Sequence, residues 1–355
     1  MKQKNKNRLI GSASALATSL IFMAGVVSPA SADDGSDAGN PTDPVVHEIS
    51  PGSQESAEEF WTKERLEAAE PMEMPTVSPE ELNEESSGPA EGGGGVVTSD
   101  PVAPEADPGE RPMGGDATTV TRAVGAGDQT VAEVPVPSTV GRLFFTTPSG
   151  GSGSCSASTV AGGDGTKIIT AGHCVHPGGD DNASWNGNFV FIPSYYKGSA
   201  PQGAWYGNRV AAFVGWKRDK NFRYDQAIVS LERKDGRTIT QAVGANGLVG
   251  GNSANVSGNR IWGYPSASPF DGSLPYYCDG TAVDNGGSDS VMRCGMNEGA
   301  SGGPWIKDRV NENLGYTWTV TSRCVGPSAR PGTNCALTNL LASPNPLQIF
   351  DLLGA

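Results

Sequence analysis

The chain has 355 residues and a formal net charge of −14, with 39 acidic and 25 basic residues. The acidity is unevenly placed, because residues 33–135 hold 24 acidic and four basic residues, whereas residues 136–355 hold 15 and 17. The second part is therefore nearly neutral and has no cluster of basic residues, which excludes the electrostatic signature of a nucleic-acid-binding protein.

The first 32 residues predict a secretory signal peptide. They begin with four basic residues, continue with a mostly apolar stretch and end in Ala30-Ser31-Ala32, which is the usual order of such a signal. A membrane anchor would be followed by basic residues, and acidic residues follow here instead. No other stretch approaches the roughly 18 apolar residues of a spanning helix. We therefore expect a secreted, extracellular protein with no membrane partner.

Residues 33–135 predict an acidic pro-segment that is mostly disordered. Two parts of it, residues 33–57 and 76–135, are rich in Gly, Pro, Ser and acidic residues and poor in aromatic ones. Such a composition cannot bury enough apolar surface to offset the entropy of the chain.

One stretch of this segment, residues 58–69, has a different pattern. Trp61, Leu66 and Ala69 recur at helical spacing, and acidic residues occupy the first turn, where the helix dipole favours them. The stretch is either a nascent helix in a tail or a helix by which the pro-segment docks on the rest of the chain.

From residue 136 to residue 355 the pattern is all-β. Short runs rich in β-branched and aromatic residues alternate with clusters of Gly, Pro, Asn and Asp, which is typical of a sandwich or barrel. The runs are 142–146, 167–170, 188–192, 210–214, 226–231, 260–264 and 317–321. About 220 residues suit one such domain. Only residues 346–353 have helical spacing, and they predict a terminal helix packed on the barrel.

All six cysteines lie in this second part, and an even number in an exported chain favours disulfides over metal ligation. There is no C-x-x-C pair, so we expect neither a metal nor a cofactor. Residues 180–182, with Asn186 and Asn188, have the oxygen ligands of a Ca²⁺ site, although a solvated loop is the preferred interpretation. Pairing in sequence order is one of 15 connectivities and would join Cys155–Cys174, Cys278–Cys294 and Cys324–Cys335.

Residues 296–305 read MNEGASGGPW and surround Ser301 with small residues. Glycine permits unusual backbone conformations and lets another molecule approach the main chain. A bare hydroxyl on a rigid turn suits a nucleophile, although an ordinary Gly-rich turn has the same pattern. A serine nucleophile also needs a base beside it.

The chain offers three histidines as that base. His47 lies in the acidic segment and His176 in a polar loop, whereas His173 ends a predicted strand beside a cysteine. Asp225 precedes an apolar strand and is the best group to orient the imidazole. The competing aspartates lie among charges in solvated loops: Asp219 and Asp235.

The order of these residues along the chain discriminates between folds. The elbow G-x-S-x-G of α/β-hydrolases requires a histidine after the serine, and none follows Ser301. The subtilisin order would need Asp164, which lies in a Gly-rich turn. The order His173, Asp225, Ser301 is that of the chymotrypsin fold.

Three blocks resemble the catalytic blocks of trypsin-like serine endopeptidases: TAGHC at 170–174, DQAIV at 225–229 and GASGGP at 299–304. Other stretches resemble the bacterial secreted, glutamyl-endopeptidase-like branch of that family: 141–146, 155–158, 263–265, 301–305 and, in the acidic segment, 60–65. The likeness covers residues 136–355 and, more loosely, residues 58–71.

The resemblance implies two six-stranded antiparallel β-barrels with the active site between them. Ser301 would attack a peptide carbonyl, His173 would act as the base and Asp225 would hold the imidazole. The backbone N–H groups of Gly299 and Ser301 would bind the oxyanion, and a Cys155–Cys174 bridge would anchor the histidine loop. The protein would be a secreted zymogen and a monomer, with its own pro-segment and protein or peptide substrates as partners.

Two departures from the family pattern concern activation and specificity. Ala300 stands where animal digestive enzymes carry the aspartate that captures a new N-terminus. Thr321 and Ser322 fall at the expected substrate pocket, where Glu-specific members carry a histidine, and no acid lies near Gly295. We therefore expect a neutral pocket. The alternative function is a catalytically silent relative that binds through its barrel surface, although no member of the triad is missing.

Overall fold

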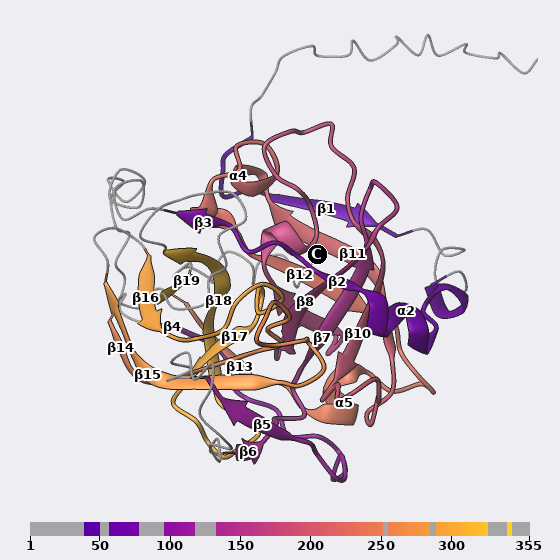
Figure 1. Ribbon diagram of the computed structural model, residues 1–355, viewed down its shortest axis with the longest axis vertical. Helices are drawn as coiled ribbons and strands as arrows, with labels where there is room; N and C mark the ends of the chain where they lie inside the picture. The colour runs from indigo at the N-terminus through magenta and orange to yellow at the C-terminus, as the bar shows by residue number, and fades with distance from the viewer. Residues whose placement is uncertain are drawn as a thin grey trace, which may run out of the picture. The chain divides into compact units, whose positions relative to one another are not determined.

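The computed structural model describes residues 39–49, 57–77, 96–117, 133–250, 255–284, 289–325 and 339–342, which are all-β with a few short helices (Figure 1). The predicted signal peptide, the predicted helix at 346–353 and Cys335 lie outside the described residues. Within the described residues, no helix has the length and the apolar character needed to cross a membrane.

Six antiparallel strands close into a barrel: β7 (Val140–Thr146), β8 (Ser152–Thr159), β9 (Lys167–Thr170), β10 (Gly187–Pro193), β11 (Trp205–Phe213) and β12 (Ala227–Leu231). They pair in the order β10-β7-β8-β9-β12-β11, and β11 pairs again with β10. Alternate residues of a strand point to the same face, so Leu143 and Phe145 of β7 meet Phe189 and Phe191 of β10 in the buried interior. The predicted barrel is confirmed for this half of the domain.

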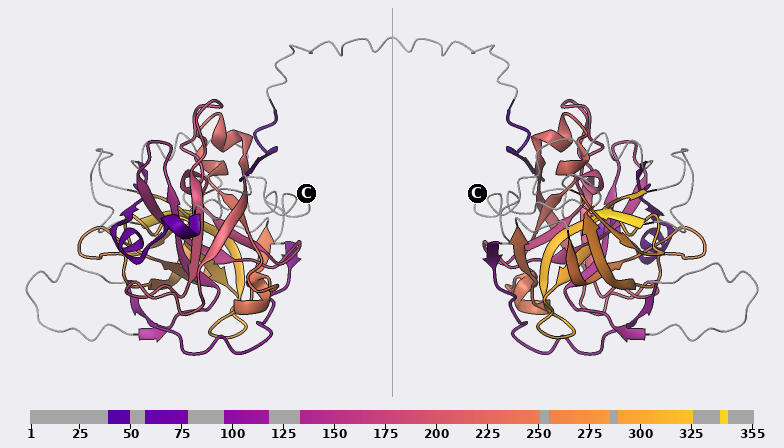
Figure 2. Two further views of the ribbon diagram at one scale, coloured as in Figure 1. Left: turned by 90° about the vertical axis from the view of Figure 1, so that its right-hand side faces the viewer. Right: turned by 90° about the vertical axis from the view of Figure 1, so that its left-hand side faces the viewer.

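The second sheet contains β13 (Gly247–Gly250), β14 (Val256–Gly263), β15 (Tyr276–Asp284), β16 (Ser290–Arg293), β17 (Pro304–Lys307), β18 (Tyr316–Val325) and β19 (Asn339–Ala342). Its main path is β14-β17-β18-β19-β16-β15, and β14 also pairs with β15. Trp305 and Trp318 pack edge to face in its core, with ring centroids 5.7 Å apart. In both views of Figure 2 these orange and yellow strands lie beside the strands of the barrel, and β14 and β17 contact β8.

The short helices are α2 (Lys63–Ala68), η1 (Gly172–Cys174), α4 (Val214–Lys217), η2 (Phe222–Tyr224) and α5 (Ile239–Val243). Two of them position the candidate site. Because β9 and β12 are antiparallel and Thr170 is paired with Ala227, the end of β9 lies beside the start of β12. The helix η1, which follows β9, and η2, which precedes β12, therefore meet at one end of this strand pair.

The described part of residues 39–135 adds short strands to both sheets. They are β1 (Pro44–Glu48) on β11, β2 (Glu70–Pro71) on β8, β3 (Thr76–Val77) on β18, β4 (Val96–Ser99) on β13, β5 (Met113–Asp116) on β15 and β6 (Glu133–Pro135) on β5. The strands other than β2 lie within residues 33–57 and 76–135, for which we predicted disorder, so the structure differs from that prediction there. An added strand gains backbone hydrogen bonds from an existing sheet edge, so it needs little apolar surface of its own.

Helix α2 follows a helical turn at residues 57–60, in the stretch for which the sequence left two interpretations open. Trp61 and Leu66 are buried. The indole N–H of Trp61 donates to the carbonyl of Asn188 at 2.6 Å, and its ring lies 5.7 Å from that of Phe144. These contacts are those of a helix docked on the barrel, and they agree with the second interpretation.

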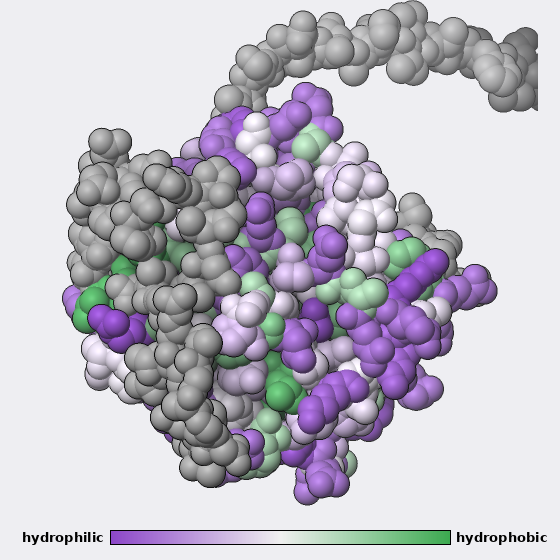
Figure 3. Space-filling model, in the orientation of Figure 1, coloured by the Kyte–Doolittle hydropathy of each residue, from purple (hydrophilic) through white to green (hydrophobic). Residues whose placement is uncertain are grey.

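The surface seen in the orientation of Figure 1 is mostly hydrophilic, with small separate hydrophobic areas (Figure 3). Among the described residues, the exposed large hydrophobic side chains are few: Val46, Val102, Met113, Val283 and Val310. They come from separate elements, and scattered apolar side chains of this kind are normal on a folded protein.

Replacement of Trp61 tests how firmly the helix is docked. We expect Trp61→Phe to lower the free energy of unfolding by about 1 kcal/mol, since it removes one hydrogen bond but keeps most apolar contacts. Trp61→Ala should cost about 3 kcal/mol because it also leaves a cavity against Phe144. Urea denaturation of the full chain measures both values. Equal effects of the two variants would contradict the packing role.

Candidate active site

The first element of the site is the histidine turn. His173 lies in η1 immediately after β9 and is 4% exposed. Its neighbour Cys174 forms a disulfide with Cys155 of β8, which ties the turn to the adjacent strand. A second disulfide joins Cys278 and Cys294. These are the first two of the sequential pairs.

The carboxylate of Asp225 is completely buried and accepts three hydrogen bonds. Its Oδ2 lies 2.8 Å from Nδ1 of His173 and 2.6 Å from the hydroxyl of Ser322, and its Oδ1 accepts from the backbone N–H of His173 at 2.8 Å. A buried carboxylate needs such donors to offset its desolvation. Because Nδ1 donates to Asp225, Nε2 of the neutral ring is left as the acceptor.

The other two aspartates that the sequence offered are engaged elsewhere or exposed. Asp219 forms a two-pronged ion pair with Arg218, with both N–O distances at 2.7 Å. Asp235 is an exposed turn residue with a φ of 52°. Of the three candidates, Asp225 is the one that contacts His173.

The serine turn, residues 299–303, has two left-handed glycines, Gly299 at φ 91° and Gly302 at φ 77°. The N–H of Gly303 donates to the carbonyl of Ala300 at 3.0 Å and closes the turn. The backbone N–H of Ser156 donates to the carbonyl of Ser301 at 2.7 Å, and its hydroxyl donates to the carbonyl of Gly299 at 2.9 Å. The turn is thus held by β8, which belongs to the barrel that supplies the histidine.

Gly302 packs the serine turn against the segment that precedes His173. A Cβ at this glycine would overlap Oγ1 of Thr170 and would lie 2.8 Å from the backbone N of Ala171. The side chains of His173 and Ser301 each keep one buried atom, Nε2 and Oγ, that has no hydrogen-bond partner among the described residues. These are the two atoms between which a serine hydroxyl would pass its proton to a base.

Thr321 and Ser322, which the sequence placed at the substrate pocket, lie buried in β18. The hydroxyl of Thr321 accepts from the indole N–H of Trp305 at 3.0 Å, and its backbone bonds to Gly302 and Gly303. The hydroxyl of Ser322 is directed at Asp225. Both hydroxyls are therefore engaged within the fold.

Sequence reasoning placed Ser322 at the substrate pocket and Ser156 in the stretch 155–158, but it missed the contacts that these two serines make. Ser322 donates to Asp225, and Ser156 binds two carbonyls of the serine turn. Neither serine has a spacing or composition from which these contacts could have been inferred. Only the position of Ser156 directly after Cys155 connected it to the histidine loop.

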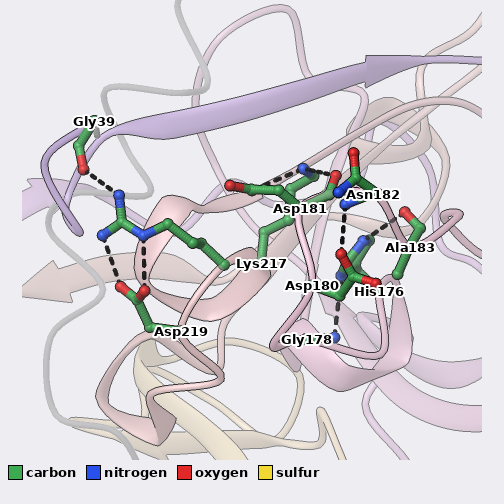
Figure 4. Close-up of polar contacts among 10 residues, drawn as sticks. Gly39, His176, Gly178, Asp180, Asp181, Asn182, Ala183, Lys217 and Asp219 are labelled. Atoms are coloured by element: carbon green, nitrogen blue, oxygen red, sulfur yellow. Dashed lines mark hydrogen bonds and ion pairs between the residues drawn. The ribbon is translucent and has the colours of Figure 1, made fainter. Parts of the chain in front are cut away.

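Two groups of residues have the composition of a metal site. The side chains of Cys155, His173 and Cys174 lie within 4.8 Å of one another, but the two cysteines form a disulfide and offer no thiolate. In the loop that the sequence offered for Ca²⁺, Nζ of Lys217 lies 3.0 Å from a carboxylate oxygen of Asp181 (Figure 4). A side-chain cation thus already binds that carboxylate. Asn186 faces inward and donates to the carbonyl of Cys174 at 3.0 Å.

His176 organises the loop that follows the histidine turn (Figure 4). The N–H of Gly178 donates to its Nδ1 at 3.0 Å, so Nε2 carries the hydrogen and donates to the carbonyl of Ala183 at 3.0 Å. Its carbonyl accepts from the indole of Trp216 at 2.9 Å. Burial lowers the pKa of His176, and the ammonium of Lys217 lowers it further.

This lowered pKa predicts that part of the stability depends on pH. The folded protein favours the neutral ring, whereas the unfolded chain binds a proton near pH 6.5. The contribution is therefore present above about pH 6.5 and is lost as the pH falls below it. We expect the urea midpoint to drop between about pH 7.5 and pH 5.5, and to drop less in His176→Asn. Parallel curves for the two proteins would contradict this role.

The tight contact at Gly302 predicts a large effect of one methyl group. Gly302→Ala combines a left-handed φ with overlap of the added methyl carbon against Thr170 and the carbonyl of Ser156. Gly236 is a matched control, since its φ is 76° but nothing lies within 4 Å of its Cβ position. We expect Gly236→Ala to cost about 1 kcal/mol and Gly302→Ala to cost several times more. Similar melting temperatures for both variants would contradict this.

No protein-family model and no curated protein matches this sequence. Among solved structures, the protease Anisep from Arthrobacter nicotinovorans is 28% identical with a TM-score of 0.52, over 59% of this chain and 90% of that one. The thermostable serine protease AL20 from an extremophilic microorganism is 30% identical with a TM-score of 0.51, over 58% and 90%. A Glu endopeptidase is 16% identical with a TM-score of 0.43, which is too distant to assign that branch. The chain is therefore a protein of the chymotrypsin-type serine protease fold.

Proposed function

We propose that the protein is a secreted serine endopeptidase that cleaves peptide bonds through His173, Asp225 and Ser301. The single observation that carries this proposal is the buried carboxylate of Asp225, which accepts two hydrogen bonds from His173 and so holds the ring in one tautomer and one orientation. The similarity to solved proteases supports the general class. The triad itself, the secretion and the zymogen form are parts of the proposal.

In the proposed first step, Oγ of Ser301 attacks the carbonyl carbon of the substrate while Nε2 of His173 takes the hydroxyl proton. The resulting imidazolium gives that proton to the leaving amine as the peptide C–N bond breaks. An acyl ester on Ser301 remains. A water molecule then gives a proton to His173 and attacks the ester carbonyl. The imidazolium returns that proton to Oγ of Ser301 as the ester C–O bond breaks, which releases the acid and restores the serine.

Asp225 stabilises the imidazolium that forms in each half of this cycle, and it is itself held by Ser322. We assign Ser322 a positioning role, because it touches Asp225 and not the reacting atoms. A buried negative charge beside a forming positive charge acts strongly in a site from which water is excluded.

The backbone N–H groups of Gly299 and Ser301 are the proposed donors to the oxyanion. Neither has an acceptor among the described residues, whereas the N–H groups of Ala300, Gly302 and Gly303 all donate within the fold. The positive φ of Gly299 orients this turn. One such donor contributes roughly 3–4 kcal/mol to lowering the barrier.

For specificity we propose a neutral side chain at the cleaved bond. Thr321 and Ser322 supply no charge to the proposed pocket, and the apolar side chains near the serine turn include Met296 and Ala300. No histidine lies in β18, so a preference for glutamate is not part of this proposal.

The remaining parts of the proposal concern how the chain is processed and how its mature domain is built. We propose that residues 1–32 are a signal peptide, that residues 33–135 are a pro-segment, and that residues 136–355 form the mature domain. The second sheet would be its second six-stranded barrel, with the helix at 346–353 packed beside it. The mature enzyme would work as a monomer.

The test is removal of the proposed nucleophile. We expect Ser301→Ala to lower turnover of a denatured protein substrate by roughly a million-fold without changing the melting temperature, because the loss is chemical. A fluorophosphonate should form an adduct on Ser301 of the active enzyme and none on the variant. Retained proteolysis in Ser301→Ala would rule out this nucleophile. If Ser301 of the wild-type protein never forms an adduct, the alternative of a catalytically silent binding protein is favoured instead.

A further inference from the structure

Residues 69–77 run between the two sheets and pair with a strand of each. Strand β2 pairs in parallel with β8, with Pro71 opposite Ser154, and β3 pairs in parallel with β18, with Thr76 opposite Cys324. Figure 1 shows this indigo segment passing from α2 through β2 to β3. Both partner strands also hold residues of the proposed active site.

The first attachment is to Ser154. The backbone N–H of Met72 donates to the carbonyl of Ser154 at 2.8 Å, and the hydroxyl of Ser154 donates to the carbonyl of Glu70 at 3.2 Å. Ser154 lies two residues before Ser156, which binds the carbonyls of Gly299 and Ser301. This attachment therefore lies next to the serine turn along β8.

The second attachment is to Cys324. Its backbone N–H donates to the carbonyl of Pro75 at 2.9 Å. Cys324 lies two residues after Ser322, whose hydroxyl binds Asp225. The segment is thus fixed to β8 near Ser156, which holds the turn of the proposed nucleophile. It is also fixed to β18 near Ser322, which binds Asp225.

Between the two attachments, Met74 points inward and Glu73 points outward. Met74 is 4% exposed and belongs to the apolar cluster that contains Met296 and Ala300, with its sulfur 3.1 Å from the sulfur of Cys324. Glu73 is exposed. Met74 thus anchors the segment in the apolar core of the second sheet, against Cys324 of β18.

The two reactive atoms are themselves sealed in the full chain. Oγ of Ser301 and Nε2 of His173 are buried, so a polypeptide can reach them only after some part of the protein moves. The edges of β8 and β18 would pair with an extended substrate through backbone hydrogen bonds, and residues 69–77 already use groups on both edges.

We propose that residues 69–77 form an inhibitory strap, which occupies the strand edges on either side of the catalytic residues and keeps the full chain inactive until it is displaced or cut. This inference rests on the proposed function. The strap acts by occupancy alone and forms no covalent bond. Met74 is its central anchor, and the docked helix α2 with Trp61 fixes its beginning.

The experiment measures how fast a small fluorophosphonate labels Ser301 in the full chain. We expect slow labelling of the wild type and labelling at least about tenfold faster in Met74→Asp. Burying a carboxylate in that apolar cluster is costly, so the equilibrium between the docked and the displaced strap should shift at least about tenfold toward the displaced form. The matched control is Glu73→Gln, which changes the adjacent exposed residue and should label at the wild-type rate. Equal rates for Met74→Asp and wild type, both folded by their melting curves, would overturn the strap.

A second measurement uses the wild-type chain and does not depend on a variant that folds. Thermolysin, a metalloprotease that fluorophosphonates do not label, is used to cut residues 69–77 and is then stopped with a chelator. We expect labelling of Ser301 to rise at least about tenfold after the cut. Fast labelling before the cut with no rise after it would overturn the strap and leave the protease proposal standing. Absence of any adduct in every sample would overturn the protease proposal, and the strap with it.

Discussion

The arrangement of the candidate site depends on one buried carboxylate. Asp225 has no contact with solvent, and a negative charge in such a place is stable only when donors surround it. Two of its three donors come from His173 and one from Ser322. The hydrogen bonds that this carboxylate requires therefore hold the imidazole of His173, the residues just before β12 and the Ser322 region of β18 in fixed relative positions.

The serine turn joins this group through backbone contacts, not through charge. Ser156 binds two of its carbonyls, and the absence of a side chain at Gly302 lets it approach Thr170 closely. Because these contacts involve β8 and the end of β9, the turn of the second sheet is positioned by strands of the first barrel. Backbone hydrogen bonds of this kind can hold a site between two sheets rigidly.

The described part of residues 39–135 is also attached to the domain through backbone hydrogen bonds. Its short strands have little apolar surface, and they are ordered because the sheets of the domain offer unpaired backbone groups. Its buried side chains include Trp61, which bonds to Asn188 of the barrel, and Met74, which lies in the core of the second sheet. Backbone pairing and buried side chains thus both hold the described part of this segment on the domain.

The sequence by itself determined the class of fold, the strands around residues 142–146, 167–170 and 226–231, and the identity of the residues proposed for catalysis. It could do so because strand periodicity is local, and because the chain has few histidines and one order of His173, Asp225 and Ser301. The contact of Asp225 with His173, the contacts of Ser156 and Ser322, and the strand pairing of the described parts of the acidic segment were decided only by the tertiary structure. These features depend on pairing between strands far apart along the chain, and composition alone cannot reveal which backbone edges will meet.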